Sequence, residues 1–360
     1  MGNVLSEIQR IPTSAARAVE YFEVDGAGHL IVPQLAYDAE GSPGGMNGGN
    51  SNTDVLVLRR EGDTFTPAGK LPGTGGEDAE FFEIDGRRFL AVASIRIGSG
   101  PYNFLTGSPI YEWADGGFVP FQTVSSYAAK QWRHFEIEGT HFLALAQNRP
   151  GDLDVSSAVF RWSGERFERF QDIPSRGGYN FEYFSLDGQH YLAHADHVLP
   201  SRLYRWDGTA FVDHQDLVPT GGRAFALIAT GGTTYLAVAS MFSESQLLRW
   251  NGGEFVAHAT LEGGPGGREF AVVDAPGGPY LVRVTFVTGG QANPTPQQTS
   301  YVYRIQDGKP EVVDTFATTG GTDAVVIPAG DGGILLAVSN ALAPDVTFAT
   351  DTVLYRFDAS

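Results

Sequence analysis

The chain has 360 residues, of which 42% are hydrophobic, and its formal net charge is −18 with only 24 Lys and Arg residues. This acidic balance argues against nucleic acid or an anionic membrane as a partner. The absence of cysteine excludes disulfides, thiolate metal sites and thiol catalysis. No apolar run approaches the roughly 18 residues of a membrane span, so no span is expected.

The first predicted element of each repeat is a strand that begins with two small residues. The pattern, seen as GGYNFEYF at residues 177–184, is a small pair, five further residues and a large apolar residue. Regular repeats of about 40–50 residues are typical of β-propellers. Seven copies occur, at residues 15–22, 75–82, 128–135, 177–184, 221–228, 266–273 and 320–327.

Three more strands are predicted after each of these. A turn, often Asp-Gly, leads to a second strand such as FLAVAS at residues 89–94. A variable loop then leads to a third strand, such as AVFRW at residues 158–162, and a fourth strand such as FERFQDIP at residues 167–174. Each repeat is therefore predicted to form one four-stranded sheet.

The last repeat lacks its fourth strand, because the chain stops after TVLYRFDAS. A matching segment, SEIQRIPT at residues 6–13, lies at the other end of the chain. Pairing it with the last sheet would close a ring and remove a sheet edge. We therefore predict an all-β, seven-bladed β-propeller, a single domain over residues 1–360 and a monomer; the alternative, two β-sandwiches, gives no reason for seven copies.

The repeats also resemble a known family. WRHFEIEGTHFLALAQN at residues 132–148 and SSAVFRWSGERFERFQDIPS at residues 156–175 are similar to the epilepsy-associated repeat, also called EAR or EPTP. The resemblance covers nearly the whole chain and implies a stand-alone propeller of a kind used for extracellular protein recognition. What a fold is used for is nevertheless set by its site.

Compartment and source are less constrained. The start of the chain has no apolar signal region, which predicts a cytoplasmic protein, although an extracellular one stays open if the chain is processed. The preference for Arg over Lys indicates a GC-rich and hence bacterial genome.

The first strand of each blade should line the central channel, and its polar positions offer oxygen atoms. The row two residues after the small pair carries carboxylates and amides, which suit a hard cation such as Ca²⁺. A water-filled acidic channel without a metal is the equal alternative, and no other cofactor is predicted. The candidate metal ligands are Asp78, Gln131, Asn180, Glu269 and Asp323.

One residue earlier in the repeat the sign of the charge reverses. Arg17, Lys130, Arg223 and Arg268 occupy this position, which we place in the loop that leads into the channel. Converging cations bind carboxylate or phosphate, but they could equally pair with acids beneath them such as Asp78. Arg133 adds a cation on the channel row, and His134 and Tyr179 add acid–base or hydrogen-bonding capacity at the same mouth.

Two second strands carry an ionisable residue where the other copies are apolar. These residues are His194 and Arg283. A buried ionisable group needs a partner, so we favour a structural role beside an acid such as Glu182 or Glu269 over a polar pocket between the fourth and sixth blades. Around His194, the strand period points Asp196 to the same side and His197 to the other, which argues against a metal site there.

Two functions remain open. The first is a recognition module that binds a protein or an anionic small molecule on the face at the channel mouth. The second is an enzyme, of a biosynthetic cyclase, lyase or transferase type, with its active site at that mouth and His134, Tyr179 or His194 as catalytic candidates. Long loops at residues 35–52, 95–107 and 286–298 should lie on the same face.

Overall fold

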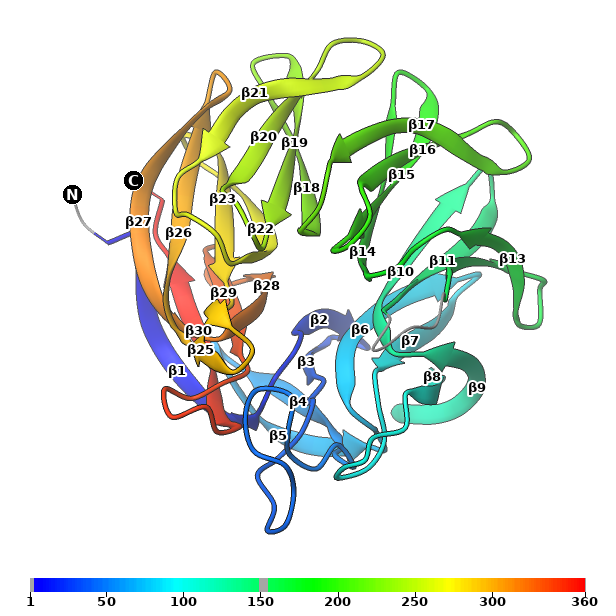
Figure 1. Ribbon diagram of the computed structural model, residues 1–360, viewed down its shortest axis with the longest axis vertical. Helices are drawn as coiled ribbons and strands as arrows, with labels where there is room; N and C mark the ends of the chain where they lie inside the picture. Colours follow the sequence, from blue (N-terminus) through cyan, green and yellow to red (C-terminus); the bar gives the residue numbers. More distant parts are fainter. Residues whose placement is uncertain (1–2, 149–154, 360) are drawn as a thin grey trace.

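The computed structural model describes residues 3–148 and 155–359 of the chain. These residues form seven four-stranded antiparallel sheets arranged in a ring, and the described part contains no helix (Figure 1). The protein is therefore a seven-bladed β-propeller, as the repeat predicts.

The first three blades lie in chain order around the ring. Blade 1 contains β2 (Glu20–Val24), β3 (Ala27–Val32), β4 (Val55–Glu61) and β5 (Thr64–Leu71). Blade 2 contains β6 (Gly76–Ile84), β7 (Arg87–Ser94), β8 (Leu105–Ala114) and β9 (Gly117–Tyr127). Blade 3 contains β10 (Ala129–Ile137), β11 (Thr140–Gln147), β12 (Ser157–Trp162) and β13 (Phe167–Ile173).

The next three blades repeat this layout, and the sixth carries an additional small hairpin. Blade 4 contains β14 (Gly178–Leu186), β15 (Gln189–Asp196), β16 (Ser201–Trp206) and β17 (Phe211–Val218). Blade 5 contains β18 (Gly222–Thr230), β19 (Thr233–Ser240), β20 (Ser245–Trp250) and β21 (Phe255–Leu261). Blade 6 contains β22 (Gly267–Ala275), β23 (Gly278–Thr285), β26 (Gln297–Gln306) and β27 (Lys309–Thr319), with the hairpin β24 (Thr288–Gly290) and β25 (Asn293–Thr295).

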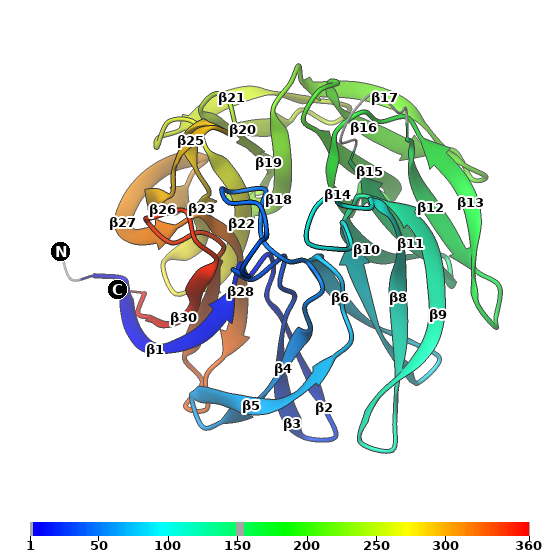
Figure 2. The same ribbon diagram turned by 60° about the horizontal axis from the view of Figure 1, so that its bottom comes forward.

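The seventh blade joins the two ends of the chain. It contains β28 (Gly321–Pro328), β29 (Ile334–Asn340) and β30 (Ala349–Phe357), and its outer strand is β1 (Leu5–Ser14). The two terminal strands are antiparallel, with Leu5 opposite Phe357 and Ser14 opposite Ala349 (Figure 2). The predicted closure by residues 6–13 is confirmed, and the observed strand is one residue longer at each end.

The Asp-Gly pairs form tight turns between the first and second strands of the blades. Asp25 and Gly26 have φ angles of 52° and 77°, and Asp187 and Gly188 have 52° and 74°. Two consecutive positive φ angles are characteristic of the type I′ turn, whose twist matches a two-residue hairpin. These turns direct each second strand back toward the face where its first strand began.

Apolar side chains pack between neighbouring blades. Seven buried clusters each join two adjacent blades, and the apolar row of the first strands, including Trp132 and Phe181, lies in them. The repeated third-strand tryptophan packs on the phenylalanine of its own hairpin, with ring centroids of Trp162 and Phe167 5.0 Å apart. The tryptophans thus serve packing.

The glutamine of the FQ landmark links the outer strands of successive blades. Gln122 Nε2 donates to the carbonyl of Phe167 at 2.8 Å, and the Phe167 N–H donates back to Gln122 Oε1 at 2.9 Å. The same reciprocal pair joins Gln171 to Phe211 and Gln215 to Phe255. Gln9 of the closing strand bonds Phe65 in the same way, so the ring closure uses the repeat's own contact.

A β-bulge recurs at the start of the first strand in blades 2 to 7. In blade 2 the pairing register shifts between Gly76 and Asp78, which leaves Glu77 as the additional residue. A bulge re-aims side chains and breaks the strict alternation of a strand. Equivalent shifts occur at Gly76/Asp78, Ala129/Gln131, Gly178/Asn180, Gly222/Phe225, Gly267/Glu269 and Gly321/Asp323.

The bulge corrects the predicted position of the cation row. Lys130, Arg223 and Arg268 lie inside strands β10, β18 and β22, not in loops. Because the bulge re-aims them, they line the channel cavity, and so do Gln131 and Glu269, which follow Lys130 and Arg268. The second small residue of the pair is required by packing, since a Cβ on Gly76 would lie 2.9 Å from Pro33 Cβ.

Candidate functional site

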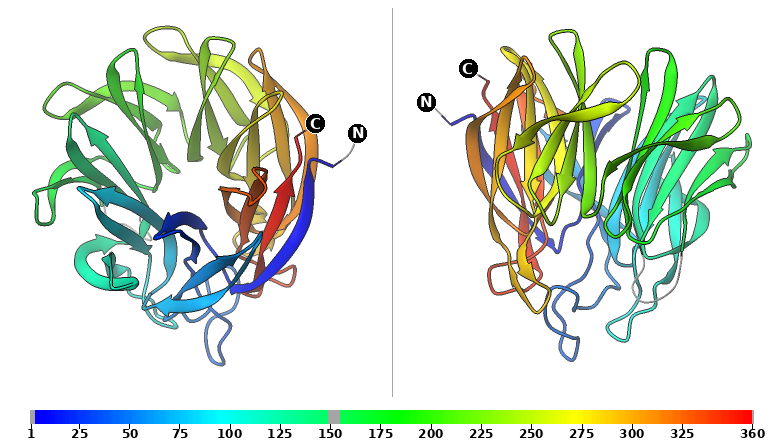
Figure 3. Two further views of the ribbon diagram at one scale, coloured as in Figure 1. Left: turned by 180° about the vertical axis from the view of Figure 1, so that it is seen from behind. Right: turned by 45° about the horizontal axis from the view of Figure 1, so that its top comes forward.

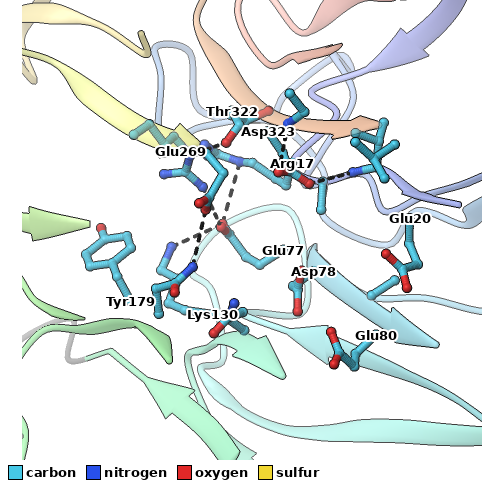
Figure 4. A pocket seen from close by; sticks show the side chains of 18 of the residues that line it. Arg17, Glu20, Glu77, Asp78, Glu80, Lys130, Tyr179, Glu269, Thr322 and Asp323 are labelled. Atoms are coloured by element: carbon cyan, nitrogen blue, oxygen red, sulfur yellow. Dashed lines mark hydrogen bonds and ion pairs between the residues drawn. The ribbon is translucent and has the colours of Figure 1, made fainter. Parts of the chain in front are cut away.

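One end of the central channel holds a polar cavity of about 220 Å³. First strands or the residues just before them contribute to its lining from all seven blades, from Arg17 in blade 1 to Thr322 and Asp323 in blade 7 (Figure 4). The loops after the second strands rise from the same end, because antiparallel pairing places the end of a second strand beside the start of a first strand. Figure 3 (right) shows the loops of residues 33–54 and 95–104 extending together from this end.

Three cations surround one carboxylate at this end of the channel. Glu77 Oε1 lies 3.1 Å from Lys130 Nζ and 3.5 Å from Arg17 Nε, and Glu77 Oε2 lies 3.5 Å from Arg268 Nη2. Only 1% of the Glu77 side chain is exposed, and the cations are 8–11% exposed. The partner of the predicted cations is therefore Glu77 of their own row, and not the acids beneath them.

The fourth cation of the row, Arg223, packs against an aromatic ring. The guanidinium carbon of Arg223 stacks 3.6 Å from the ring centroid of Tyr179, and Lys130 Nζ lies 5.1 Å from the same centroid. Arg223 is 7% exposed, and its Nε has no hydrogen-bond partner within residues 3–148 and 155–359. No ion pair involves Arg223 in that part of the chain.

Mutual burial and charge set the protonation states of this cluster. Burial alone would raise the pKa of Glu77, but the three cations outweigh burial and hold that pKa at about 2. Burial likewise opposes ionisation of Tyr179, yet Arg223 and Lys130 lower the pKa of that phenol to about 8. Burial lowers the pKa of Arg17 to about 10 and also lowers the pKa of Lys130 and of Arg223.

Apolar and loop residues form a collar around the cations. The Phe286 ring lies 5.5 Å from the guanidinium carbon of Arg17 and 5.1 Å from that of Arg268. Phe286 belongs to a buried cluster built from the loops of this face, with Leu35, Leu342 and others. The collar therefore excludes water from one side of the cation cluster.

Arg96 fixes two of the long loops over the mouth. Its Nε donates to Ser51 Oγ at 2.8 Å, and its Nη atoms donate to the carbonyls of Asn47 and Gly48 at 2.5 Å. The Tyr102 ring stacks on its guanidinium at 3.8 Å. Arg96 thus ties the loop of residues 33–54 to the loop of residues 95–104.

The predicted metal ligands all line the cavity, deeper than the cations. Several of them use an oxygen to join neighbouring blades, because they accept the backbone N–H of the next first strand. Asp78 accepts from Trp132 N–H at 2.8 Å, and Gln131 accepts from Phe181 N–H at 2.6 Å. Asp323 likewise accepts from Val19 N–H at 2.9 Å across the ring closure.

A second cation balances part of this deeper layer. Arg133 Nη2 lies 3.2 Å from Glu182 Oε2, and its Nη1 lies 3.6 Å from Glu80 Oε2. Burial lowers the pKa of Arg133, but these two acids outweigh it and raise that pKa above its ordinary value. Arg133 is therefore committed to the deeper acids and does not join the cation cluster at the mouth.

The deeper layer contains more carboxylates than Arg133 alone can neutralise. Burial, followed by the charge of neighbouring acids, raises the pKa of Asp78 and of Glu269 well above the usual range. Glu269 Oε2 also accepts from Asn180 Nδ2 at 3.2 Å. No three acidic or histidine side chains converge to hold a metal ion within the described residues, so Ca²⁺ in the channel stays a prediction.

Two of the three catalytic candidates lie away from the cavity. The His134 ring stacks on Phe82 with centroids 4.6 Å apart, and its Nε2 lies 3.1 Å from His141 Nδ1 between blades 2 and 3. Burial lowers the pKa of His134 to about 3. His134 therefore does not lie at the mouth as predicted, because the strand alternation turns it toward the neighbouring blade.

His194 and Arg283 also serve the packing between blades, but with partners other than the predicted acids. His194 is 1% exposed, its Nε2 lies 3.2 Å from Ser157 Oγ, and burial lowers its pKa to about 4. Arg283 is fully buried and donates through Nη2 to the carbonyl of Gly264 at 2.5 Å. Neither residue lines the cavity at the mouth.

The loop that follows His194 is fixed by hydrogen bonds to the carboxylate of Asp196. Asp196 Oδ1 accepts from the N–H groups of Val198 and Leu199 at 2.8 and 2.7 Å, and Asp196 also accepts from Gly177 N–H. These bonds make Asp196 an anchor of the loop that follows β15.

Sequence reasoning missed three residues of the site. Glu77 was visible only as the single acid in a row of cations, and Phe286 gave no signal because it is one apolar residue in a long loop. His197 closes the mouth beside Tyr179, with ring centroids 5.6 Å apart, and burial followed by Arg223 lowers the pKa of His197 to about 3. The contact between His197 and Tyr179 depends on the bulge that aims Tyr179 inward.

Comparisons with known proteins agree with the repeat. Four segments, residues 5–51, 117–163, 166–207 and 210–251, match the EPTP domain family. The human thrombospondin-type laminin G domain and EAR repeat-containing protein is 30% identical over 105 residues, which cover 29% of this chain and 15% of that protein. Its mouse counterpart is 37% identical over 73 residues, or 20% of this chain and 10% of that protein.

The fold is also shared with a distant solved structure. A chain from the crystal structure of BBS1N in complex with ARL6DN superposes with a TM-score of 0.59 and 10% identity, over 99% of this chain and 98% of that one. The described residues include no helix long and apolar enough to cross a membrane. This chain corresponds to only a small part of the length of the curated relatives it matches. On the repeats and the fold together, it belongs to the EAR/EPTP family of seven-bladed β-propellers.

Proposed function

We propose that this propeller is a recognition module that binds an anionic group, carried by a protein or a small molecule, at the mouth of its channel. The EPTP fold is consistent with a role in protein interaction and recognition. The binding group would be the cation cluster of Arg17, Lys130, Arg223 and Arg268. In a chain of net charge −18, four basic side chains from four different blades converge on one cavity.

The observation that carries the proposal is the state of Arg223. It is buried, it stacks on Tyr179, and within the described residues no carboxylate pairs with it. A buried charge without a partner is costly, and a protein that keeps one at the lining of a cavity can recover the cost by binding an anion there. Arginine also suits this task because its planar fork binds carboxylate or phosphate through two bonds.

The rim of the mouth supports recognition of a ligand that is apolar around its charge. Four of the exposed large apolar residues lie in the connections between second and third strands, and a fifth, Leu105, is the first residue of the third strand β8, which starts on this face. The four are Tyr37, Ile97, Val198 and Phe242, and Phe242 and Leu105 are 62% and 61% exposed. Phe242 packs on His197, with ring centroids 4.5 Å apart, so the apolar rim is continuous with the site.

A binding experiment tests the proposal. Carboxylate and phosphate compounds and acidic peptides are screened by thermal shift, and the best binder is titrated by calorimetry against Arg223→Gln and against Arg161→Gln. Arg161 is the matched control because it is an exposed arginine stacked 5.4 Å from Phe170 on a third strand, away from the cavity. Loss of one charge-assisted contact of about 1.5–3 kcal/mol should weaken binding roughly tenfold or more in Arg223→Gln alone.

Equal affinity of the two variants, or no anionic binder in the screen, would contradict the proposal. A fold check by circular dichroism accompanies the titration. Thr322 occupies the same repeat position in blade 7, so this position accepts an uncharged residue.

One observation also favours a second function, catalysis at the same mouth. Tyr179 lies between Arg223 and Lys130, and with a pKa of about 8 its phenolate could accept a proton from a bound anionic substrate and become the neutral phenol. Its partners would hold the anionic group while the phenolate acts as base. Tyr179→Phe would then keep the affinity for the anionic ligand and abolish its chemical conversion, followed by mass spectrometry; conversion that survives this change would exclude the role.

A further inference from the structure

The charges at the mouth do not balance, although nearly all of them are buried. Within the described residues, the four cations Arg17, Lys130, Arg223 and Arg268 have one carboxylate, Glu77, as ion-pair partner, so the ion pairs of the cluster leave an excess of three positive charges. The row's remaining member, Thr322, is uncharged and donates its hydroxyl to the Ala16 carbonyl at 2.8 Å.

The acids deeper in the channel make no ion pair with this cluster within the described residues, although the charge of Arg268 acts on Glu269 and Asp323. Glu80 and Glu182 pair with Arg133, and Asp78 and Asp323 each give an oxygen to the N–H of a neighbouring blade. Glu269 faces Asn180. Within the described residues, the only ion pairs made by the cation cluster are those with Glu77.

The geometry around Glu77 also shows how many of the four cations a single carboxylate can pair with. Its two oxygens receive Lys130, Arg17 and Arg268, and Arg223 still makes no ion pair. Donors that approach from four blades surround a centre from several directions. A carboxylate has two oxygens in one plane, whereas a phosphate monoester presents three acceptor oxygens in a tetrahedral arrangement, which suits donors that approach from several directions.

We infer that the group bound at the mouth is a doubly charged oxyanion of the phosphate monoester type. The inference rests on the proposed function and names the ligand chemistry of that same site. Two negative charges would leave the cluster near neutrality, and the phosphate oxygens would engage Arg223 and Lys130 on the side where Glu77 is absent. The mouth would accordingly discriminate between mono- and dianions as well as between anions and neutral molecules.

The size of the cavity limits which molecules can carry the phosphate group into it. A volume of about 220 Å³ at the end of a channel admits a phosphate and a short carrier. The carrier is a small phosphorylated molecule or a phosphorylated side chain at the tip of a peptide, and both present the same dianion.

The experiment compares two probes that differ by one charge. Methyl phosphate, mostly a dianion at pH 7 because its second pKa is about 6, and dimethyl phosphate, a monoanion, are titrated into the full chain at pH 7 by calorimetry at fixed ionic strength. The expected result is a Kd at least tenfold lower for methyl phosphate, with most of this difference lost in Arg223→Gln and kept in Arg161→Gln. A peptide with one phosphoserine is titrated in parallel, and whether it binds more tightly or less tightly than methyl phosphate identifies the carrier.

The outcomes separate this inference from the proposed function. If both probes bind at the mouth with equal affinity, the site takes anions but not specifically dianions, and only the present inference falls. If carboxylates bind and methyl phosphate does not, the inference also falls while the proposed function stands. If Arg223→Gln binds every anion as well as the unmodified chain does, both fall.

Discussion

Glu77 Oε1 and Lys130 Nζ lie 3.1 Å apart inside the propeller, with side chains that are 1% and 9% exposed. The two residues occupy the same bulge position in β6 and β10, the first strands of two successive blades. One acid at this position thereby acts as the internal counter-ion for cations that three other blades present. The mouth is held together by this carboxylate and still carries excess positive charge.

Replacing Glu77 by Gln should destabilise the fold. The change leaves Lys130, Arg17 and Arg268 without a counter-ion, and breaking a buried pair costs about 3–5 kcal/mol. Denaturant unfolding at pH 7 measures the loss, with Glu83→Gln as control because Glu83 lies on the same strand and its side chain is 56% exposed. Equal stability of both variants would show that the cations do not need this acid.

The same pair sets a pH dependence. The pKa of Glu77 falls from 4.5 to about 2 on folding, so its contribution to stability is present above pH 4.5 and is lost as the pH falls toward 2. The difference in unfolding free energy between the unmodified chain and Glu77→Gln should therefore shrink over this window. A difference that stays constant from pH 5 to pH 2.5 would contradict the low pKa.

Tyr179 should ionise near pH 8. Its phenolate is favoured by Arg223 and Lys130, which outweigh burial. Ultraviolet difference spectra of the unmodified chain and Tyr179→Phe should show one phenol that titrates near pH 8 in the unmodified chain alone. A bound anion should raise this pKa, because it neutralises the same cations. A first inflection of the titration curve near pH 10 in both proteins would mean that the cation cluster does not lower the pKa of Tyr179.

The deeper carboxylates provide a test of the channel. Because burial raises the pKa of Glu269 above its unfolded value, its contribution is present at low pH and is lost as the pH rises through the folded pKa. Glu269→Gln should thus raise Tm at pH 8 and change it little at pH 4. If instead Ca²⁺ binds there, EDTA should lower Tm and Ca²⁺ should restore it by mass action. A Tm insensitive to both reagents would favour the water-filled acidic channel.

The closing strand should be essential. Deleting residues 1–13 removes most of β1, exposes the edge of β30, and takes away the bonds between Gln9 and Phe65. We expect a large fall in Tm with aggregation through the free edge. An unchanged melting temperature in the truncated chain would contradict closure by this strand.

The repeat made the fold predictable, because seven copies of one four-strand pattern and a displaced last strand have one natural arrangement. The cation row was also visible, since repetition aligns Arg17, Lys130, Arg223 and Arg268 without a structure. What could not be predicted is the bulge, which turns two consecutive residues toward the same cavity and gives Glu77 its central place. The roles of His134 and His194 depended on which side of a blade each ring enters, and contacts such as that of His194 with Ser157 join residues 37 positions apart.

The central claim is that the mouth of the channel binds an anion, and a crystal structure determined in selenate tests it most directly. Selenate is a tetrahedral dianion, and the anomalous signal of selenium distinguishes it from water and from lighter ions. The account predicts an anomalous peak inside the cavity, within hydrogen-bond distance of Arg223 and Lys130, that disappears in Arg223→Gln crystals grown in the same solution. Selenate bound only at exposed arginines, with no anomalous peak in the cavity, would contradict it.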